Sequence, residues 1–392
     1  MRYALLFLFF LAACSNPYAT PEVQPAAQFR GITAYAPPGD NTRVRAILSH
    51  GMCSATHRAD GDVETTNWVK RRAGQIAAAL GSTAPVSLPS RPTKSYPAGR
   101  SAGQPGVHRY DVTIPHAGGT VEAVFLIWGR HVDPYRANLD YDNGRRTSET
   151  PEKPQRALLN NIGRTELMNR CLIDAVVYLG PSGNPIRHDM RHALCDILGG
   201  SFTSARPKGN PLEPATCRRP DGPGIDTVLI PESLGSTILF DAYTGLDDQR
   251  GGFFLSQRLS EIGSIYLASN QLPLLRQGTE EVGVVRAFGA GGTDSLGRFL
   301  DAVGTARAVP RAFDAGAPRF DTTELVAITD PNDVLGYRIS EEVVAGTGVD
   351  LRNVLVSNAP TYFGLFSNPI EAHRNTERPQ VFEIIVNGLA GQ

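Results

Sequence analysis

An apolar run that changes its spacing at a single serine constrains the fold of this chain more than any other feature. Residues 228–230 form a short apolar run, which predicts a buried strand. The run breaks at Pro231, and apolar residues return at helical spacing between positions 234 and 239. The sequence therefore predicts a strand, a sharp turn that contains Ser233, and a helix.

This turn resembles the nucleophile elbow G-x-S-x-G of the α/β-hydrolase family, here Pro231-Glu-Ser-Leu-Gly235. The resemblance implies that Ser233 is a nucleophile held above the edge of a sheet. The next backbone N–H, that of Leu234, would lie at the positive end of a helix and stabilise an oxyanion. Pro231 and the acidic Glu232 depart from the family pattern. Without the resemblance, the motif can equally be a helix cap that has no chemistry.

A second apolar strand is predicted over residues 43–52, and it ends in His50 and Gly51. In many α/β-hydrolases a strand with this ending precedes the loop that supplies the second oxyanion N–H. The resemblance assigns that N–H to Met52 or its neighbour. His50 alone could be a general base, but it precedes the elbow, whereas the family order is nucleophile, acid, histidine.

The acid and the base of the family have candidates further along the chain. Residues 324–329 predict another strand, and Asp330 and Asp333 follow in a turn. Asp333 matches the position of the family's acid better and Asp330 is second, although aspartates are also ordinary turn residues. His373 lies in a polar loop before the last predicted helix, where the family has its base. The resemblance thus implies a Ser233–His373–Asp333 triad that cleaves an acyl ester through an acyl-enzyme, without a metal or a cofactor.

A zinc site is a rival interpretation. His188 and His192 stand four positions apart on a predicted helix, as in the zincin motif H-E-x-x-H, and Asp189 would be the general base. No third ligand lies at a fitting distance in the sequence. Paired histidines on a helix are more often part of a solvated or half-buried face.

A further alternative is that the chain has the α/β-hydrolase fold but no catalytic activity. Pro231 and Glu232 would then mark a catalytically inactive α/β-hydrolase-fold binding or scaffold lipoprotein. Labelling by a fluorophosphonate probe would separate an active elbow from an inactive one.

The N-terminus predicts export. Residues 1–13 carry one positive charge and then an apolar run that is too short to span a bilayer, which is typical of a signal peptide. The run ends in Leu11-Ala-Ala-Cys14, which resembles the bacterial lipobox and implies lipidation of Cys14. Ser15 in place of aspartate favours the outer membrane by the family's sorting rule. We therefore expect a lipid anchor in the cell envelope that faces the periplasm. Cleavage beside a chance cysteine is the alternative.

Four further cysteines form an even set in an oxidising compartment. Cys195 and Cys217 bracket a loop rich in glycine, serine and proline, so we expect them to form a disulfide. Cys53 and Cys171 would form the other. Sequence alone leaves all three pairings open.

Strands that alternate with helices predict an α/β fold, namely a doubly wound, mostly parallel sheet with helices on both faces. Residues 14–40 are expected to be a membrane-proximal tether. Residues 41–392 would be the hydrolase domain, with an inserted cap or lid at about 130–220. The net charge of −1 gives no electrostatic argument for nucleic acid. The expected partners are the membrane and a small-molecule or lipid ester, whose acyl chain the sequence does not define.

Overall fold

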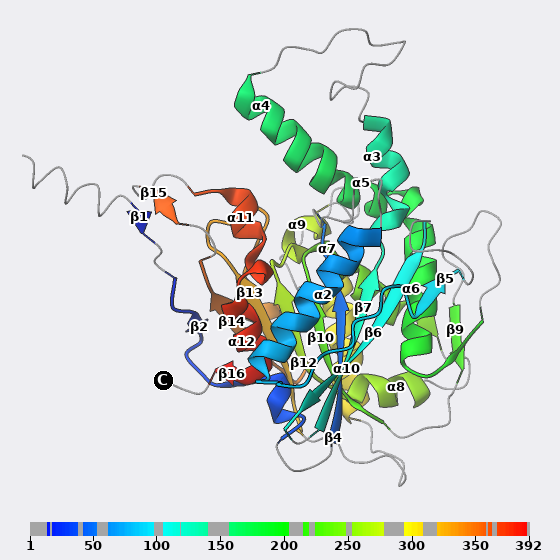
Figure 1. The fold of residues 1–392 in the computed structure, drawn as a ribbon. Helices are drawn as coiled ribbons and strands as arrows, with labels where there is room; N and C mark the ends of the chain where they lie inside the picture. Colours follow the sequence, from blue (N-terminus) through cyan, green and yellow to red (C-terminus); the bar gives the residue numbers. More distant parts are fainter. Residues whose placement is uncertain are drawn as a thin grey trace, which may run out of the picture.

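The computed structural model (Figure 1) describes residues 14–15, 18–37, 42–52, 62–97, 105–117, 119–139, 157–203, 215–218, 224–247, 253–277, 294–308, 320–357, 360–362 and 367–389. The expected signal peptide, residues 1–13, lies outside the described residues, as does Cys53.

A mostly parallel sheet forms the centre of the molecule. In the described part of the chain it has nine strands in the order β2-β14-β13-β12-β10-β4-β7-β6-β5. The strands from β14 to β7 run parallel, whereas β2 is antiparallel to β14, and β6 is antiparallel to both β7 and β5. The bounds are β2 Glu22–Gln24, β4 Thr42–Ser49, β5 Lys94–Tyr96, β6 Val107–His116, β7 Gly119–Ile127, β10 Asp226–Pro231, β12 Ile262–Ala268, β13 Thr323–Thr329 and β14 Val349–Leu355.

The strand order reverses next to β10. From β4 the chain moves to β7 on one side, and it later crosses to β10 on the other side of β4. Open α/β sheets bind their ligands at the carboxyl ends of the strands beside such a reversal. The turns that follow β4 and β10 meet at this point.

Helices cover both faces of the sheet, because strand side chains alternate between two cores. Val228 and Ile230 of β10 belong to a core shared with α2 and α12, whereas Leu229 belongs to a core shared with α6, α7 and α10. Figure 1 shows α2 and α12 next to each other on the near face of the sheet. The predicted α/β class and the mostly parallel sheet are confirmed. The covering helices are α2 Asp62–Ala79, α6 Asn184–Ile197, α7 Leu234–Thr244, α8 Phe253–Ser260, α10 Ser295–Ala308 and α12 Pro379–Asn387.

A group of helices lies between β7 and β10 in the chain, within the expected insertion. Figure 1 shows α3 and α4 beyond the end of the sheet to which the β4 arrow points. Helix α6, in contrast, packs on α7 and β6 and belongs to the layer that covers the sheet. Residues 140–156, 204–214 and 219–223 of this region lie outside the description. The elements before α6 are η2 Gly129–His131, α3 Asp133–Leu139, α4 Leu158–Ile162, the π-helical η4 Gly163–Leu172, α5 Ile173–Leu179 and η5 Pro181–Gly183.

The segment expected to be a tether is partly built into the body. Strand β2 extends the sheet beside β14, and β3 (Phe29–Arg30) pairs with β16 (Gly388–Leu389). Ile32 and Tyr35 are buried. Nearer the start, β1 (Cys14–Ser15) pairs with β15 (Thr361–Tyr362). In sequence these short apolar stretches between prolines look like a linker, and only the strand pairing and burial in the structure show otherwise.

The expected disulfide between Cys195 and Cys217 is present, and it ties α6 to β9 (Ala215–Arg218). Cys171 is also disulfide-bonded. β9 lies between β8 (Ser201–Thr203) and β11 (Leu246–Asp247) in a small separate sheet.

None of the helices in the described ranges has both the length and the apolar character needed to cross a bilayer.

Candidate active site

Ser233 stands in a strained turn between β10 and α7. Its φ of 53° and ψ of −127° are rare for a residue with a side chain. The backbone N–H of Glu232 donates to Ser49 O at 2.9 Å, and that of Ser233 donates to Ala268 O at 2.8 Å. Neighbouring strands on both sides thus hold the turn in a conformation that costs about 1–3 kcal/mol. Strain of this kind is concentrated at functional sites.

Two glycines allow the chain to pass closely around this turn. A Cβ at Gly51 would lie 2.7 Å from the Cβ of Ser233, and one at Gly235 would lie 2.5 Å from the carbonyl oxygen of His50. Both distances are shorter than van der Waals contact, so any larger residue would push the loop after β4 away from the elbow. Gly235 therefore allows α7 to begin close to the end of β4.

Ser233, His373 and Asp333 form a continuous chain of hydrogen bonds. The Oγ of Ser233 lies 3.1 Å from Nε2 of His373, and Nδ1 of His373 lies 2.9 Å from Oδ2 of Asp333. The three residues are 3%, 7% and 5% exposed, so little water competes for these bonds. His373 ends the short helix α11 (Pro369–His373), which begins where Asn368 Oδ1 accepts the N–H of Ile370 at 3.1 Å.

The two aspartates after β13 have different partners. Asp333 faces His373, and its Oδ1 accepts the backbone N–H of Leu335 at 2.9 Å. Asp330 instead accepts the backbone N–H of Asn332 at 2.9 Å, while its carbonyl accepts the N–H of Asp333 at 3.0 Å. Asp330 thus shapes the turn that presents Asp333.

The ring of His50 fixes the loop after β4. Its Nε2 accepts the backbone N–H groups of Trp128 and Gly129 at 3.0 and 3.1 Å, so the proton is on Nδ1, which donates to Gly51 O at 2.7 Å. The N–H of Met52 belongs to the same trans peptide as that carbonyl and points away from the His50 ring. Both ring nitrogens are engaged, which suits a residue that positions the loop rather than a base.

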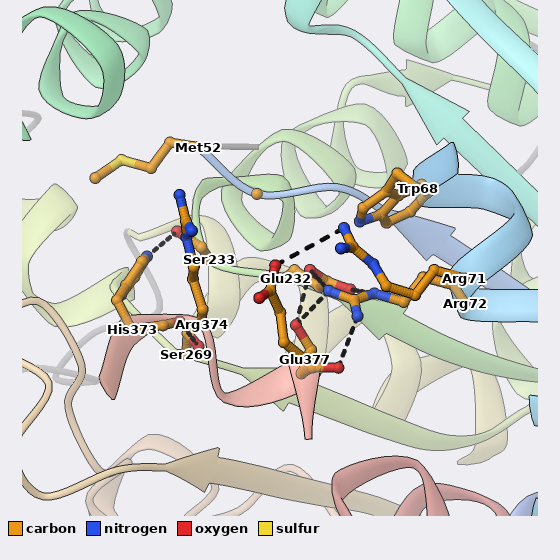
Figure 2. Close-up of a pocket in the computed structure, with 12 residues that line it drawn as sticks. Met52, Trp68, Arg71, Arg72, Glu232, Ser233, Ser269, His373, Arg374 and Glu377 are labelled. Atoms are coloured by element: carbon orange, nitrogen blue, oxygen red, sulfur yellow. Dashed lines mark hydrogen bonds and ion pairs between the residues drawn. The ribbon is translucent and has the colours of Figure 1, made fainter. Parts of the chain in front are cut away.

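Both expected oxyanion donors belong to residues near Ser233. Leu234 begins α7, where an N–H has no partner within the helix, and no acceptor for it is found among the described residues. Met52 lines the same cavity as Ser233 and His373, which encloses about 210 Å³ (Figure 2).

Glu232 has a role that the sequence does not reveal. Its carboxylate pairs with Arg72 of α2 through two contacts, at 2.8 and 3.1 Å, and also accepts the hydroxyl of Thr376 at 3.1 Å. Arg72 in turn donates to the carbonyl of Thr376 at 2.7 Å. The residue before Ser233 is thereby linked to the segment after His373 (Figure 2). A buried carboxylate signals that some partner exists, but nothing in the sequence points to an arginine 160 positions away.

The polar turn after β12 also touches the candidate base. Ser269 has a φ of 52°, and its hydroxyl donates to the carbonyl of His373 at 2.5 Å. The amide nitrogen of Gln271 lies 3.1 Å from His373 Nε2, so it shares that nitrogen with Ser233. A polar run directly after an apolar strand is the only sequence signal for these contacts.

The histidines of the zinc alternative have other partners. His188 Nδ1 lies 3.0 Å from Asp189, and the ring of His192 stacks on Phe202 at 4.6 Å between centroids. Burial opposes ionisation of Asp189, but hydrogen bonds with His131 and His188 outweigh it and hold the pKa of this carboxyl below its usual range. Burial lowers the pKa of His192. Within the described ranges, no three His, Cys, Asp or Glu side chains are grouped to hold a metal ion.

No known protein family matches the chain, and no curated protein or solved structure is significantly similar to it.

Proposed function

We propose that this chain is an α/β-hydrolase-fold serine hydrolase, anchored in the bacterial cell envelope, that cleaves a carboxylic ester through an acyl-enzyme. The observation that carries the proposal is the buried chain of hydrogen bonds from Ser233 through His373 to Asp333. A serine hydroxyl needs such a base, because it is a poor nucleophile at neutral pH. The strained turn that presents Ser233 adds support.

The reaction would proceed in two steps. In the first, His373 Nε2 takes the proton of Ser233 Oγ as the oxygen attacks the ester carbonyl, and it then returns that proton to the departing alcohol. In the second, His373 takes a proton from water as the water oxygen attacks the acyl-enzyme, and it returns that proton to Ser233 Oγ as the bond to the acyl group breaks and the carboxylic acid leaves. Asp333 holds the proton of the neutral ring on Nδ1 and stabilises the imidazolium that forms. The N–H groups of Leu234 and Met52 would bind the oxyanion of each tetrahedral intermediate.

Pro231 and Glu232 are the two departures from the family motif that would favour an inactive scaffold. Neither residue obstructs the proposed catalytic site. Pro231 lies opposite Ser49 in the pairing of β10 with β4. Glu232 directs its carboxylate to Arg72 and Thr376 and does not bond to Ser233 or His373 in the described structure. Neither residue therefore interferes with the proton relay.

The envelope location rests on the N-terminal sequence. The lipobox-like run up to Cys14 supports cleavage and lipidation at that residue. Tri-acylation would anchor the protein firmly, whereas a single chain binds a membrane only marginally. Ser15 supports the outer membrane as the destination.

Covalent labelling tests the proposal. A fluorophosphonate probe should label the purified protein, and Ser233→Ala and His373→Ala should each abolish the labelling and ester turnover, because the pair acts as one unit. Ser295→Ala and His192→Ala are matched controls that make the same substitutions away from the elbow, and both should label normally. EDTA should change nothing. Full labelling of Ser233→Ala, or loss of activity on chelation, would contradict the proposal.

A further inference from the structure

The cavity beside Ser233 is lined by an unusual number of charged side chains. Three arginines and two glutamates share it with the proposed catalytic pair. They come from α2, from the elbow and from the segment 374–377 that follows His373. The residues that line the cavity are Gly51, Met52, Trp68, Arg71, Arg72, Glu232, Ser233, Ser269, His373, Arg374, Thr376 and Glu377.

Two of the three arginines have carboxylate partners. Arg72 is buried and fully engaged by Glu232, as described above. Arg71 lies 3.7 Å from Glu377, and both side chains are more than 40% exposed, so this pair is loose and screened by water. Each of these two ion pairs therefore has no net charge.

Arg374 is left as an uncompensated cation. Its backbone bonds to Glu371 and Glu377, but its guanidinium has no hydrogen-bond or ion-pair partner within the described residues. Figure 2 shows the side chain extending from the backbone beside His373 toward Met52, on the side of the cavity where Ser233 lies. A guanidinium presents a planar fork of donors that matches a carboxylate or a phosphate.

We propose that this cavity takes an ester whose molecule also carries an anionic group, and that Arg374 binds that group while Ser233 attacks the ester carbon. Arg71 adds a second cation at the rim, since a ligand anion can compete for its loose contact with Glu377. The proposal rests on the hydrolase function above and names its substrate class. The anionic group takes no part in bond making or breaking.

The size of the cavity limits the substrate. The described walls enclose about 210 Å³, which is less than the roughly 300–1,000 Å³ of sites for drug-sized ligands. A short acyl group with the anion a few bonds from the ester fits such a space.

Matched esters test the assignment. The full-length protein would be assayed with 4-nitrophenyl pentanoate, with mono-4-nitrophenyl glutarate, and with a 4-nitrophenyl ester of similar length that ends in phosphate. We expect kcat/KM to favour an anionic ester, and Arg374→Gln to lower it for that ester about 3- to 10-fold, because the Arg374 side chain is exposed and water screens part of its charge. The neutral ester should change less than about twofold, and Arg374→Lys should recover part of the loss, because the charge remains. Whichever anionic ester is preferred identifies carboxylate or phosphate as the group that Arg374 binds.

Controls separate the possible failures. Arg43→Gln removes an exposed arginine at the start of β4, at the opposite end of the strand, and should change neither ester. Equal kcat/KM for neutral and anionic esters, or an equal loss on both in Arg374→Gln, would overturn the proposal. If no ester is hydrolysed and no probe labels Ser233, the hydrolase function itself fails. Calorimetric binding of the anionic and neutral esters to Ser233→Ala then still tests Arg374, and equal affinities would overturn it.

Discussion

Single residues decide the proposed chemistry, and the clearest case is the pair of aspartates after β13. Both are buried, but only Asp333 contacts His373, while Asp330 bonds to its own turn. Loss of the carboxylate that fixes the histidine tautomer lowers turnover by about 10⁴ in enzymes with this triad. We expect Asp333→Asn to lower kcat by about this factor.

Asp330→Asn is the comparison variant, because an asparagine oxygen can still accept the N–H of Asn332. It should reduce kcat far less, as measured by steady-state hydrolysis of the same ester. The reverse ranking would show that the geometry of the turn, and not the tautomer of His373, limits the reaction.

The sequence could predict those residues of the candidate site that have a local signal around them. The selection of Ser233, Asp333 and His373 rests on the resemblance to the α/β-hydrolase elbow and on the family order. Each of the three also has a local signal, because it follows a predicted strand or precedes a predicted helix. The partners of Glu232 and the contacts of Gln271 lie more than 100 positions away. Only the packing of α2 and α11 around β10 brings them together.

Whole elements are joined by the buried pair of Glu232 and Arg72. The pair connects the end of β10 to α2, and Thr376 adds the η7 segment (Asn375–Glu377). The guanidinium of Arg72 also lies 5.8 Å from the ring centroid of Trp68. This ion pair therefore joins the elbow to these two elements, in addition to the hydrophobic core that β10 shares with α2.

Arg72→Met should lower the free energy of unfolding by about 3–5 kcal/mol, because it leaves the Glu232 carboxylate buried without a counter-charge. The double variant Arg72→Met with Glu232→Leu should recover most of this loss. Arg71→Met is the neighbouring control, and its exposed pair should change the free energy by no more than about 1 kcal/mol. Urea unfolding measures all three. An Arg72→Met variant as stable as Arg71→Met would mean that the pair does not hold these elements together.

Long elements with strong apolar patterns were predicted well, and short ones were not. The strand expected over 43–52 is β4, and the strand expected over 324–329 is β13. Strand β2 was not predicted, because three residues are too few to show an alternation of apolar and polar side chains. Its position beside β14 results from pairing between distant parts of the chain. The same holds for the buried residues around Ile32, which were expected to be part of a tether and which the structure packs into the core.

At the scale of the whole molecule, the proposed anchor would determine where the protein works. Cys14→Ser should abolish membrane association, because it removes the thiol to which the proposed lipid would be attached. Phase separation in detergent measures this directly: the wild type should enter the detergent phase and the variant the aqueous phase. Wild-type partitioning of Cys14→Ser would contradict lipidation at this residue. Fluorophosphonate labelling of the variant should persist, since the substitution leaves Ser233 in place.

The pairing of β1 with β15 bears on how such a protein would meet its substrates. Cys14 lies opposite Tyr362, and the hydroxyl of Thr361 accepts the side-chain amide of Asn332 at 3.5 Å, in the turn that presents Asp333. A lipid on Cys14 would therefore enter the bilayer beside the turn that carries Asp333, without a length of free chain between them. The proposed hydrolase would then sample a layer close to the bilayer and not the full depth of the periplasm. Its rate would then follow the number of ester molecules per area of membrane rather than their concentration in solution.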